Sequence, residues 1–378
     1  MMGKVKIHTL FQYLLDAAEA QPRAVVGFSL SASPRLGEFL GDLDPDLPLD
    51  WNGVDFRGLP MLRDRVLAQA GLTGVCAAND VLITAGAAEA NYLVLRQLLE
   101  PGDEIVVEHP GWPQAEVLAQ AMDVTVRRVA RDEGAEWALL LDALAEAVTP
   151  RTKLIFLTNP NNPTGALMDL ATLDAIVDIA RDAGAWLLVD EVYAGLEWSG
   201  PRSPSVAGMY ERGITTGSVS KALGLQGLRT GWLICRNPEL VMDAVILREN
   251  GSEIMNVLGE HIACAALEPV RLAAALDKAR AEGRANLDHM SHWLAATDGL
   301  TWVPPAAGLI GLAKLRDGID SDAFAGALLA EPYRTFILPG SAYDLPGYVR
   351  LGVGGGAEVN LQEGLTQVAA LLSTLGDE

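Results

Sequence analysis

Two stretches decide the fold: Leu187-Leu-Val-Asp-Glu-Val-Tyr193 and Ile214-Thr-Thr-Gly-Ser-Val-Ser-Lys221. Each begins as a short apolar run and ends in residues that carry chemistry, Asp190 in the first and Lys221 in the second. Short runs that are apolar on both faces are typical of parallel strands covered by helices on both sides. Because α/β sheets bind ligands at the carboxyl ends of their strands, both stretches point to one ligand-binding edge.

The same pattern continues on either side of these two stretches, from about residue 59 to residue 250. Short apolar runs alternate there with helix-length amphipathic stretches such as Ala87–Leu99 and Asp169–Ala183. The alternation predicts an α/β domain with a mainly parallel sheet of about seven strands covered by helices. The predicted strands are Val81–Thr84, Ile105–Val107, Val124–Val129, Leu154–Leu157, Trp186–Val189, Ile214–Val219 and Trp232–Ile234.

The pattern changes after about residue 270, where a long helix (Arg271–Ala295) precedes strands punctuated by Pro and Gly. We expect a smaller α+β domain over residues 271–378, a large domain over residues 51–270, and an N-terminal helix and segment over residues 1–50 that packs with the small domain and the active site. The strands predicted in the small domain are Leu300–Val303, Ile310–Lys314, Phe336–Leu338 and Val349–Val353, and the closing helix is Leu361–Thr374.

Composition excludes several classes of protein. The chain has 378 residues, of which 50% are hydrophobic, and a formal net charge of −21, which opposes binding to nucleic acid or to an anionic membrane. Its three cysteines form no C-x-x-C pair, so we expect no disulfide, no metal site and a reducing, cytoplasmic location. Asp16 and Glu19 interrupt the first apolar stretch, which argues against a signal peptide, and no uncharged stretch is long enough to span a membrane.

Lys221 differs in context from the other five lysines of the chain. It follows an apolar strand directly and precedes a glycine-rich turn that ends at Arg229. A desolvated lysine at a strand's carboxyl end can lose its proton and form an imine. The hydroxyls of Ser218 and Ser220 and the guanidinium of Arg229 are suited to hold a phosphate.

Other strand ends add further chemistry. The carboxylate of Asp190, at the end of an apolar run, needs a cationic partner, which a protonated ring nitrogen would supply. Residues 158–165, Thr-Asn-Pro-Asn-Asn-Pro-Thr-Gly, form a turn directly after a strand, and Trp112 offers a flat aromatic face. In Thr84-Ala-Gly-Ala-Ala88 a strand passes into a helix, whose free N–H groups form an anion site.

Taken in order, these motifs resemble the class I/II aminotransferases, the fold-type-I enzymes that use pyridoxal 5′-phosphate, from about Gly58 to Gly354. The matching motifs are Asn162-Pro-Thr-Gly165, Asp190-x-x-Tyr193, Ser218-x-Ser-Lys221 with Arg229 eight residues later, and Arg350-Leu-Gly352. The resemblance implies a fold-type-I α/β fold, a homodimer, and a reaction between an L-amino acid and a 2-oxo acid.

The resemblance also implies a role for each residue. Lys221 would bind the cofactor covalently and move the proton, Asp190 would pair with the pyridine nitrogen, and Tyr193 and Asn162 would hydrogen-bond the phenolic oxygen. Arg350 would bind the substrate α-carboxylate, in a site that Asn162 and Trp112 also line. Trp112 would stack on the ring, and the phosphate would be held by Gly86, Ala87, Ala88, Ser218, Ser220 and Arg229.

Three departures from the family pattern suggest a specialised member. Gly53 stands where relatives usually have a tyrosine that reaches the neighbouring subunit's phosphate, and Ala87 and Ala88 replace hydroxyl residues. Ser31-Ala-Ser-Pro34 replaces a Gly-x-Pro near the substrate.

Several functions stay open or are excluded. The same fold and cofactor also support elimination, replacement, ring closure or oxidation, as in enzymes similar to capreomycidine synthases, and the site residues do not separate these from amino transfer. A penicillin-recognising hydrolase would need S-D-N and K-T-G strings, which are missing. A regulator of this fold would carry a basic DNA-binding domain, for which the chain has neither extra length nor basic charge.

Two structural details complete the predictions. We expect cis peptide bonds at Asn162-Pro163 and His109-Pro110. The acidic N-terminal segment is expected to fold over the site and favour arginine-like substrates through one of the carboxylates of Glu38, Asp42, Asp44 and Asp46.

Overall fold

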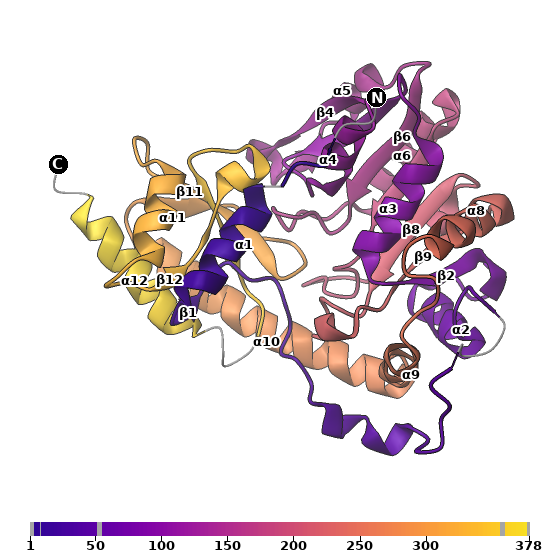
Figure 1. The fold of residues 1–378 in the computed structure, drawn as a ribbon. Helices are drawn as coiled ribbons and strands as arrows, with labels where there is room; N and C mark the ends of the chain where they lie inside the picture. The colour runs from indigo at the N-terminus through magenta and orange to yellow at the C-terminus, as the bar shows by residue number, and fades with distance from the viewer. Residues whose placement is uncertain (1–3, 8, 51–54, 356–359, 376–378) are drawn as a thin grey trace.

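The computed structural model describes residues 4–7, 9–50, 55–355 and 360–375, and the fold is shown in Figure 1. Gly53, at which the sequence departs from its relatives, lies outside the described residues. Within the described chain, no helix is both long and apolar enough to cross a membrane.

An eight-stranded sheet forms the centre of the larger part, with the order β2-β9-β8-β7-β6-β3-β4-β5. Strand β9 runs antiparallel to both neighbours, β5 runs antiparallel to β4, and the remaining pairs are parallel. The strands are β2 (Val81–Thr84), β3 (Glu104–His109), β4 (Thr125–Asp132), β5 (Ala138–Leu139), β6 (Thr152–Thr158), β7 (Trp186–Asp190), β8 (Gly213–Ser218) and β9 (Gly231–Cys235).

All seven predicted strands of this sheet are confirmed, but the predicted count was one short. The eighth strand, β5, is two residues long and pairs at the edge of the sheet. Two residues are too few to show a period, so the sequence carried no signal for β5.

Helices cover both faces of this sheet because successive strand residues point to opposite sides. Leu188 packs with the helices of one face, α3 (Ala87–Leu98), α4 (Gln114–Ala121) and α8 (Pro238–Glu249). Leu187 and Val189 pack on the other face with α5 (Leu141–Ala147), α6 (Leu170–Ala183) and α7 (Val206–Met209). Helices α2 (Pro60–Gln69) and α9 (Val257–Ala266) complete the coverage near β2 and β9.

Helix α6 illustrates how the sequence sets these elements. The carboxylate of Asp169 accepts a hydrogen bond from the backbone N–H of Thr172 at 2.8 Å and caps the first turn. Gly184, with φ of 65°, ends the helix in the left-handed conformation that glycine adopts at least cost. Between them Leu173, Ile176, Val177 and Ala180 recur at helical spacing and are buried against the sheet.

A second, antiparallel sheet, of order β10-β11-β14-β13, forms the core of the smaller part. Its strands are β10 (Leu300–Trp302), β11 (Ile310–Leu315), β13 (Leu338–Pro339) and β14 (Tyr348–Gly352). Helices α10 (Pro269–Ala295), α11 (Ser321–Leu329) and α12 (Leu361–Thr374) pack with it. In Figure 1, α10 runs along the molecule from the large part to this small sheet.

The predicted strand Phe336–Leu338 is wrong as a single element. Phe336 belongs to β12 (Thr335–Phe336), which pairs in parallel with β1 (Ala24–Val25) from the other end of the chain. Leu338 belongs to β13 and pairs with Arg350 of β14. The run divides because its two ends have different partners, which local sequence does not reveal.

The N-terminal segment joins the two parts. Helix α1 (Thr9–Ala20) packs on the small part through Leu10 and Ala17. The segment after β1 then crosses to the large sheet, where the backbone N–H of Ser31 donates to the carbonyl of Lys221 at 3.1 Å.

Short 3-10 helices complete the chain: η1 (Leu36–Glu38), η2 (Leu40–Asp42), η3 (Ala78–Asp80), η4 (Glu133–Ala135), η5 (Gln226–Leu228) and η6 (Gly340–Tyr343).

Candidate active site

A cavity of about 280 Å³ lies where the carboxyl ends of the large sheet meet the small part and the N-terminal segment. Among the predicted site residues, all except Gly86 line it: Ala87, Ala88, Trp112, Asn162, Asp190, Tyr193, Ser218, Ser220, Lys221, Arg229 and Arg350. Gly86 directly precedes Ala87 and is the N-cap residue of α3. The structure therefore brings residues that are far apart in the sequence to one place.

Lys221 follows β8 and points its ammonium group into the cavity. Its Nζ donates to the hydroxyl of Ser29 at 3.4 Å and lies 5.9 Å from the centre of the Tyr193 ring. Burial and, after it, the nearby charge of Arg350 lower the pKa of Lys221 to about 8, whereas the charge of Asp190 opposes the shift. The amine is thus more readily deprotonated than an exposed lysine.

Asp190 ends β7 and is only 4% exposed. Its carboxylate accepts hydrogen bonds from Asn91 Nδ2 at 2.8 Å and from the backbone N–H of Val192 at 3.2 Å. Burial raises the pKa of Asp190 to about 6, although the hydrogen bonds from Asn91 and Val192 and the charge of Lys221 act in the opposite direction. No cation within the described chain forms an ion pair with this carboxylate. A protonated ring nitrogen in the cavity would supply that cation.

An anion site lies at the start of α3. The guanidinium of Arg229 donates only to backbone carbonyls, those of Gln226 at 3.2 Å and Ala85 at 3.1 Å, and forms no ion pair with a described residue. Gly86 has φ of 88°, and a Cβ atom there would lie 2.4 Å from Arg229 Nη2, so only glycine lets the guanidinium reach this helix terminus. The free backbone N–H groups at the start of α3 and the hydroxyls of Ser218 and Ser220 are together suited to hold a phosphate.

Arg350 of β14 forms the opposite end of the cavity. It is 5% exposed and has no carboxylate partner among the described residues. Its Nε and Nη2 donate to the carbonyl of Gly27 at 3.2 and 2.6 Å, and its Nη1 donates to the hydroxyl of Tyr343 at 2.7 Å and to Asn162 Oδ1 at 3.5 Å. A buried arginine held in this way by neutral oxygens is suited to bind a carboxylate.

Two buried hydroxyls that face the cavity or its edge, Tyr193 and Thr158 Oγ1, have no hydrogen-bond partner of ordinary geometry among the described residues. Burial raises the pKa of Tyr193, so its hydroxyl stays protonated and can donate. Buried polar atoms without partners are costly, and a ligand with an oxygen acceptor would satisfy Tyr193.

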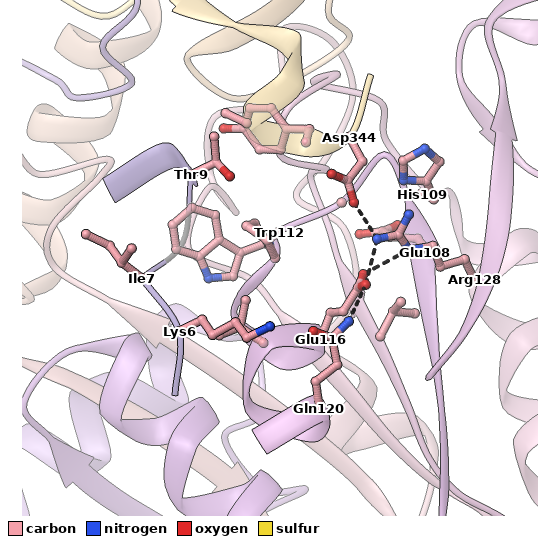
Figure 2. A pocket seen from close by; sticks show the side chains of 16 residues that line it. Lys6, Ile7, Thr9, Glu108, His109, Trp112, Glu116, Gln120, Arg128 and Asp344 are labelled. Carbon is pink, nitrogen blue, oxygen red and sulfur yellow. Dashed lines mark hydrogen bonds and ion pairs between the residues drawn. The ribbon is translucent and has the colours of Figure 1, made fainter. Parts of the chain in front are cut away.

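A neighbouring pocket of about 240 Å³, whose lining includes Trp112 and Tyr343, is shown in Figure 2. Arg128 crosses it and pairs with Glu116 of α4 at 2.6 Å and with Asp344, which follows η6. The pair between Arg128 and Asp344 joins the large part to the small part at this pocket.

Both predicted cis peptide bonds, Asn162-Pro163 and His109-Pro110, are confirmed. Asn159-Pro160 and Glu331-Pro332 are also cis, and neither was predicted.

Within the described chain, the acidic N-terminal segment does not reach the cavity. Asp42 pairs with Arg271 at 2.7 Å, Glu38 accepts from the backbone N–H of Arg35, and Asp44 accepts from the backbone N–H of Asp46. The residues that cover the cavity come earlier, at Phe28, Ser29 and Leu30. The prediction was wrong because the chain leaves the site after Ser33, which accepts from the lining residue Gln226 at 3.0 Å, and composition alone does not indicate that path.

Sequence reasoning missed Asn91 and Tyr343. Asn91 orients Asp190, and its own Oδ1 accepts from Thr216 Oγ1 at 2.7 Å. An amide on the apolar face of α3 was the available signal for Asn91. Tyr343 donates to Asn162 Oδ1 at 3.0 Å and is the last residue of the 3-10 helix η6, which is too short to show a periodicity in the sequence.

These groups fit pyridoxal 5′-phosphate. The cavity places a carboxylate in need of a cation, a tyrosine hydroxyl in need of an acceptor and an unpaired arginine at a helix start around one lysine. The carboxylate suits the protonated ring nitrogen of that cofactor, and the tyrosine hydroxyl suits its phenolic oxygen. The arginine suits the phosphate, and the lysine suits the aldehyde.

Comparison with known proteins gives the same result. Residues 52–368 match the family model of the class I and II aminotransferases. Arginine–pyruvate transaminase AruH of Pseudomonas aeruginosa is 31% identical over 85% of this chain and 82% of its own length. Capreomycidine synthase of Streptomyces vinaceus is 29% identical over 88% of this chain and 85% of its own.

A solved structure extends the likeness to the whole fold. A PLP-dependent aminotransferase from Streptococcus suis superposes with a TM-score of 0.90 over 99% of this chain and all (100%) of the other, at 26% identity. The chain belongs to the class I and II aminotransferases and is a pyridoxal-phosphate-dependent enzyme of fold type I.

Proposed function

We propose that the protein transfers the amino group of an L-amino acid to a 2-oxo acid. The observation that carries the proposal is Arg350, a buried guanidinium without a carboxylate partner among the described residues, in the same cavity as Lys221. Both substrates of such a reaction carry a carboxylate beside the reacting carbon, and one arginine can bind the two in turn.

In this proposal Lys221 attaches the cofactor and later moves the proton at the substrate α-carbon. A pKa of about 8 gives a substantial neutral fraction near neutral pH, which both tasks require. Ser29 accepts from Nζ at 3.4 Å and helps to aim it.

Asp190 holds the ring nitrogen in its protonated form, and the hydrogen bond from Asn91 keeps the carboxylate facing the cavity. The cofactor, when bound, supplies the electron sink for the α-carbon. Tyr193 and Asn162 donate to its phenolic oxygen, Trp112 covers one side of the ring, and Ser218, Ser220, Arg229 and the backbone at Gly86, Ala87 and Ala88 hold the phosphate.

A second candidate is ring closure on the same cofactor. The likeness to capreomycidine synthase over 88% of this chain supports it. Such a reaction would use Lys221, Asp190 and Arg350 in the same places, so site geometry does not separate the two.

Incubation of the holoenzyme with an amino acid and no oxo acid tests the proposal. Amino transfer yields one equivalent of 2-oxo acid per chain and retains the amino group on the enzyme until an oxo acid is added. Release of ammonia or peroxide, or a cyclic amino acid as product, would contradict amino transfer and favour the second candidate.

We also propose the division into an N-terminal segment over residues 1–50 and domains over residues 51–270 and 271–378, a homodimer, and a cytoplasmic location. The three cysteines, Cys76, Cys235 and Cys264, are free and buried, in keeping with a reducing compartment. A light-scattering mass equal to one chain at micromolar concentration would contradict the dimer.

A further inference from the structure

One wall of the cavity is assigned to neither the cofactor nor the α-carboxylate, and it is apolar. It consists of side chains from α1, from the segment that follows β1 and from the chain after β7, namely Leu10, Leu14, Phe28, Leu30 and Val192. The other lining residues are polar or are assigned to the cofactor and the α-carboxylate, so this wall is the apolar surface available to the substrate side chain.

Phe28 lies beside the place where the substrate α-carbon must sit. Its neighbour Gly27 accepts hydrogen bonds from Arg350, and its other neighbour Ser29 accepts from Lys221. The Phe28 ring packs against Phe336 with 5.8 Å between centroids, which holds it in position. An amino acid bound between Arg350 and Lys221 therefore has Phe28 next to its side chain.

Helix α1 supplies the outer part of this wall. Leu10 is 5% exposed, and Leu14 is half-buried in the same apolar cluster, which also contains Tyr343, Phe336 and Trp112. Leu15, the next residue, is 50% exposed and does not line the cavity.

The charged residues among the described lining leave no partner for a charged substrate side chain. Asp190 is the only carboxylate among the described lining residues, and it accepts from Asn91 and from Val192. The cations Lys221, Arg229 and Arg350 serve the cofactor and the α-carboxylate in the proposed function. A charge brought against the apolar wall would lose water without gaining a partner.

We propose that this wall selects amino acids with apolar side chains of about the size of leucine or phenylalanine. The inference rests on the proposed function and adds its substrate class. It separates this chain from the relative whose name specifies arginine, because a guanidinium would need a carboxylate that the described wall does not contain.

Absorbance titration of the holoenzyme with leucine, phenylalanine, arginine and glutamate tests the inference. We expect half-saturation by leucine or phenylalanine at a concentration at least about tenfold lower than by arginine or glutamate. Equal or tighter binding of arginine or glutamate would overturn the inference and leave the proposed function standing. A response to none of the four would overturn both.

Two variants of α1 locate the effect. Leu14→Asp places a carboxylate in the wall, and we expect it to weaken leucine binding about tenfold and to strengthen arginine binding by a similar factor. Leu15→Asp makes the same change on the exposed face and should alter neither affinity. Leu14→Gln, which adds polarity without charge, should weaken leucine binding without improving arginine binding.

Calorimetry of amino-acid binding and thermal melting of each variant complete the test. A folded Leu14→Asp protein with unchanged affinity for both amino acids would show that α1 does not contact the substrate and would overturn the inference. If Leu14→Asp does not fold, the Leu14→Gln titration decides in its place: unchanged leucine binding overturns the inference, and weakened leucine binding supports it.

Discussion

Replacing Tyr343 with phenylalanine removes one oxygen atom from the carboxylate end of the cavity. That hydroxyl accepts from Arg350 Nη1 at 2.7 Å and donates to Asn162 Oδ1 at 3.0 Å. Burial raises the pKa of Tyr343 to about 12, so the hydroxyl is protonated at every working pH. Tyr343 is 4% exposed, which leaves little room for water to take its place.

The free-energy cost of losing the Tyr343 hydroxyl depends on the hydrogen bonds that Arg350 keeps. A hydrogen bond to a charged group contributes about 1.5 to 3 kcal/mol. Because the carbonyl of Gly27 still holds Nε and Nη2 of Arg350, we expect the lower end, about 1.5 kcal/mol, which corresponds to about a tenfold rise in KM for the amino acid. Arg350 still reaches the substrate, so kcat should change by less than about threefold.

Steady-state kinetics and thermal melting of Tyr343→Phe check this expectation. Tyr348→Phe is the matched control: its hydroxyl donates to Glu133 at 2.6 Å rather than contacting Arg350 or Asn162, so its loss should leave KM unchanged. An unchanged or lower KM in Tyr343→Phe, or an equal rise in both variants, would refute the role of Tyr343 in orienting Arg350.

Three further outcomes are expected at the cofactor end. Lys221→Ala should abolish the borohydride-reducible link to the cofactor. In the native apo chain the rate of cofactor attachment should rise about tenfold between pH 6 and pH 7, because only the neutral amine is a nucleophile and its fraction rises about tenfold per pH unit below the pKa of about 8. An attachment rate that is independent of pH, followed by absorbance, would contradict this. Asp190→Asn should retain the cofactor and lose activity by orders of magnitude, since an amide does not stabilise a protonated ring nitrogen; near-normal turnover would remove Asp190 from the mechanism. Gly86→Ala should weaken cofactor binding at least about tenfold in a fluorescence titration, because its Cβ would meet Arg229 at 2.4 Å. Gly326→Ala, in helix α11, is the control, since the added Cβ would have no atom from outside its own helix within 4 Å. It should bind cofactor normally and stabilise the protein by about 0.5 to 1 kcal/mol.

The sequence predicted the parts of this molecule whose signals are local. Apolar runs predicted each main strand of the large sheet, and polar residues at strand ends such as Asp190 and Lys221 marked the ligand-binding edge. The motifs then predicted which side chains share the cavity, because parallel strands bring their carboxyl ends together.

What the sequence did not predict depends on contacts between distant segments. Gly27 contributes a backbone carbonyl, which has no sequence code, and Tyr343 acts from the four-residue 3-10 helix η6, which is too short to be recognised from sequence. The path of the N-terminal segment is set by pairing with β12 and by the bond from Ser31 to Lys221, so composition placed the acidic residues wrongly. The apolar wall of the cavity was the least predictable feature, because most of its residues come from the N-terminal helix and that segment.

The pairing of β1 with β12 also orders events during synthesis of the chain. Ala24 and Val25 leave the ribosome early, yet their partners Thr335 and Phe336 follow only when most of the polypeptide exists. The strands that carry Asp190 and Lys221 are complete well before then, and domains generally fold as units from the N-terminal side. Contacts so distant in sequence form slowly, because a long loop must close first. The cofactor end of the cavity can therefore assemble while translation continues, and the substrate end is finished last.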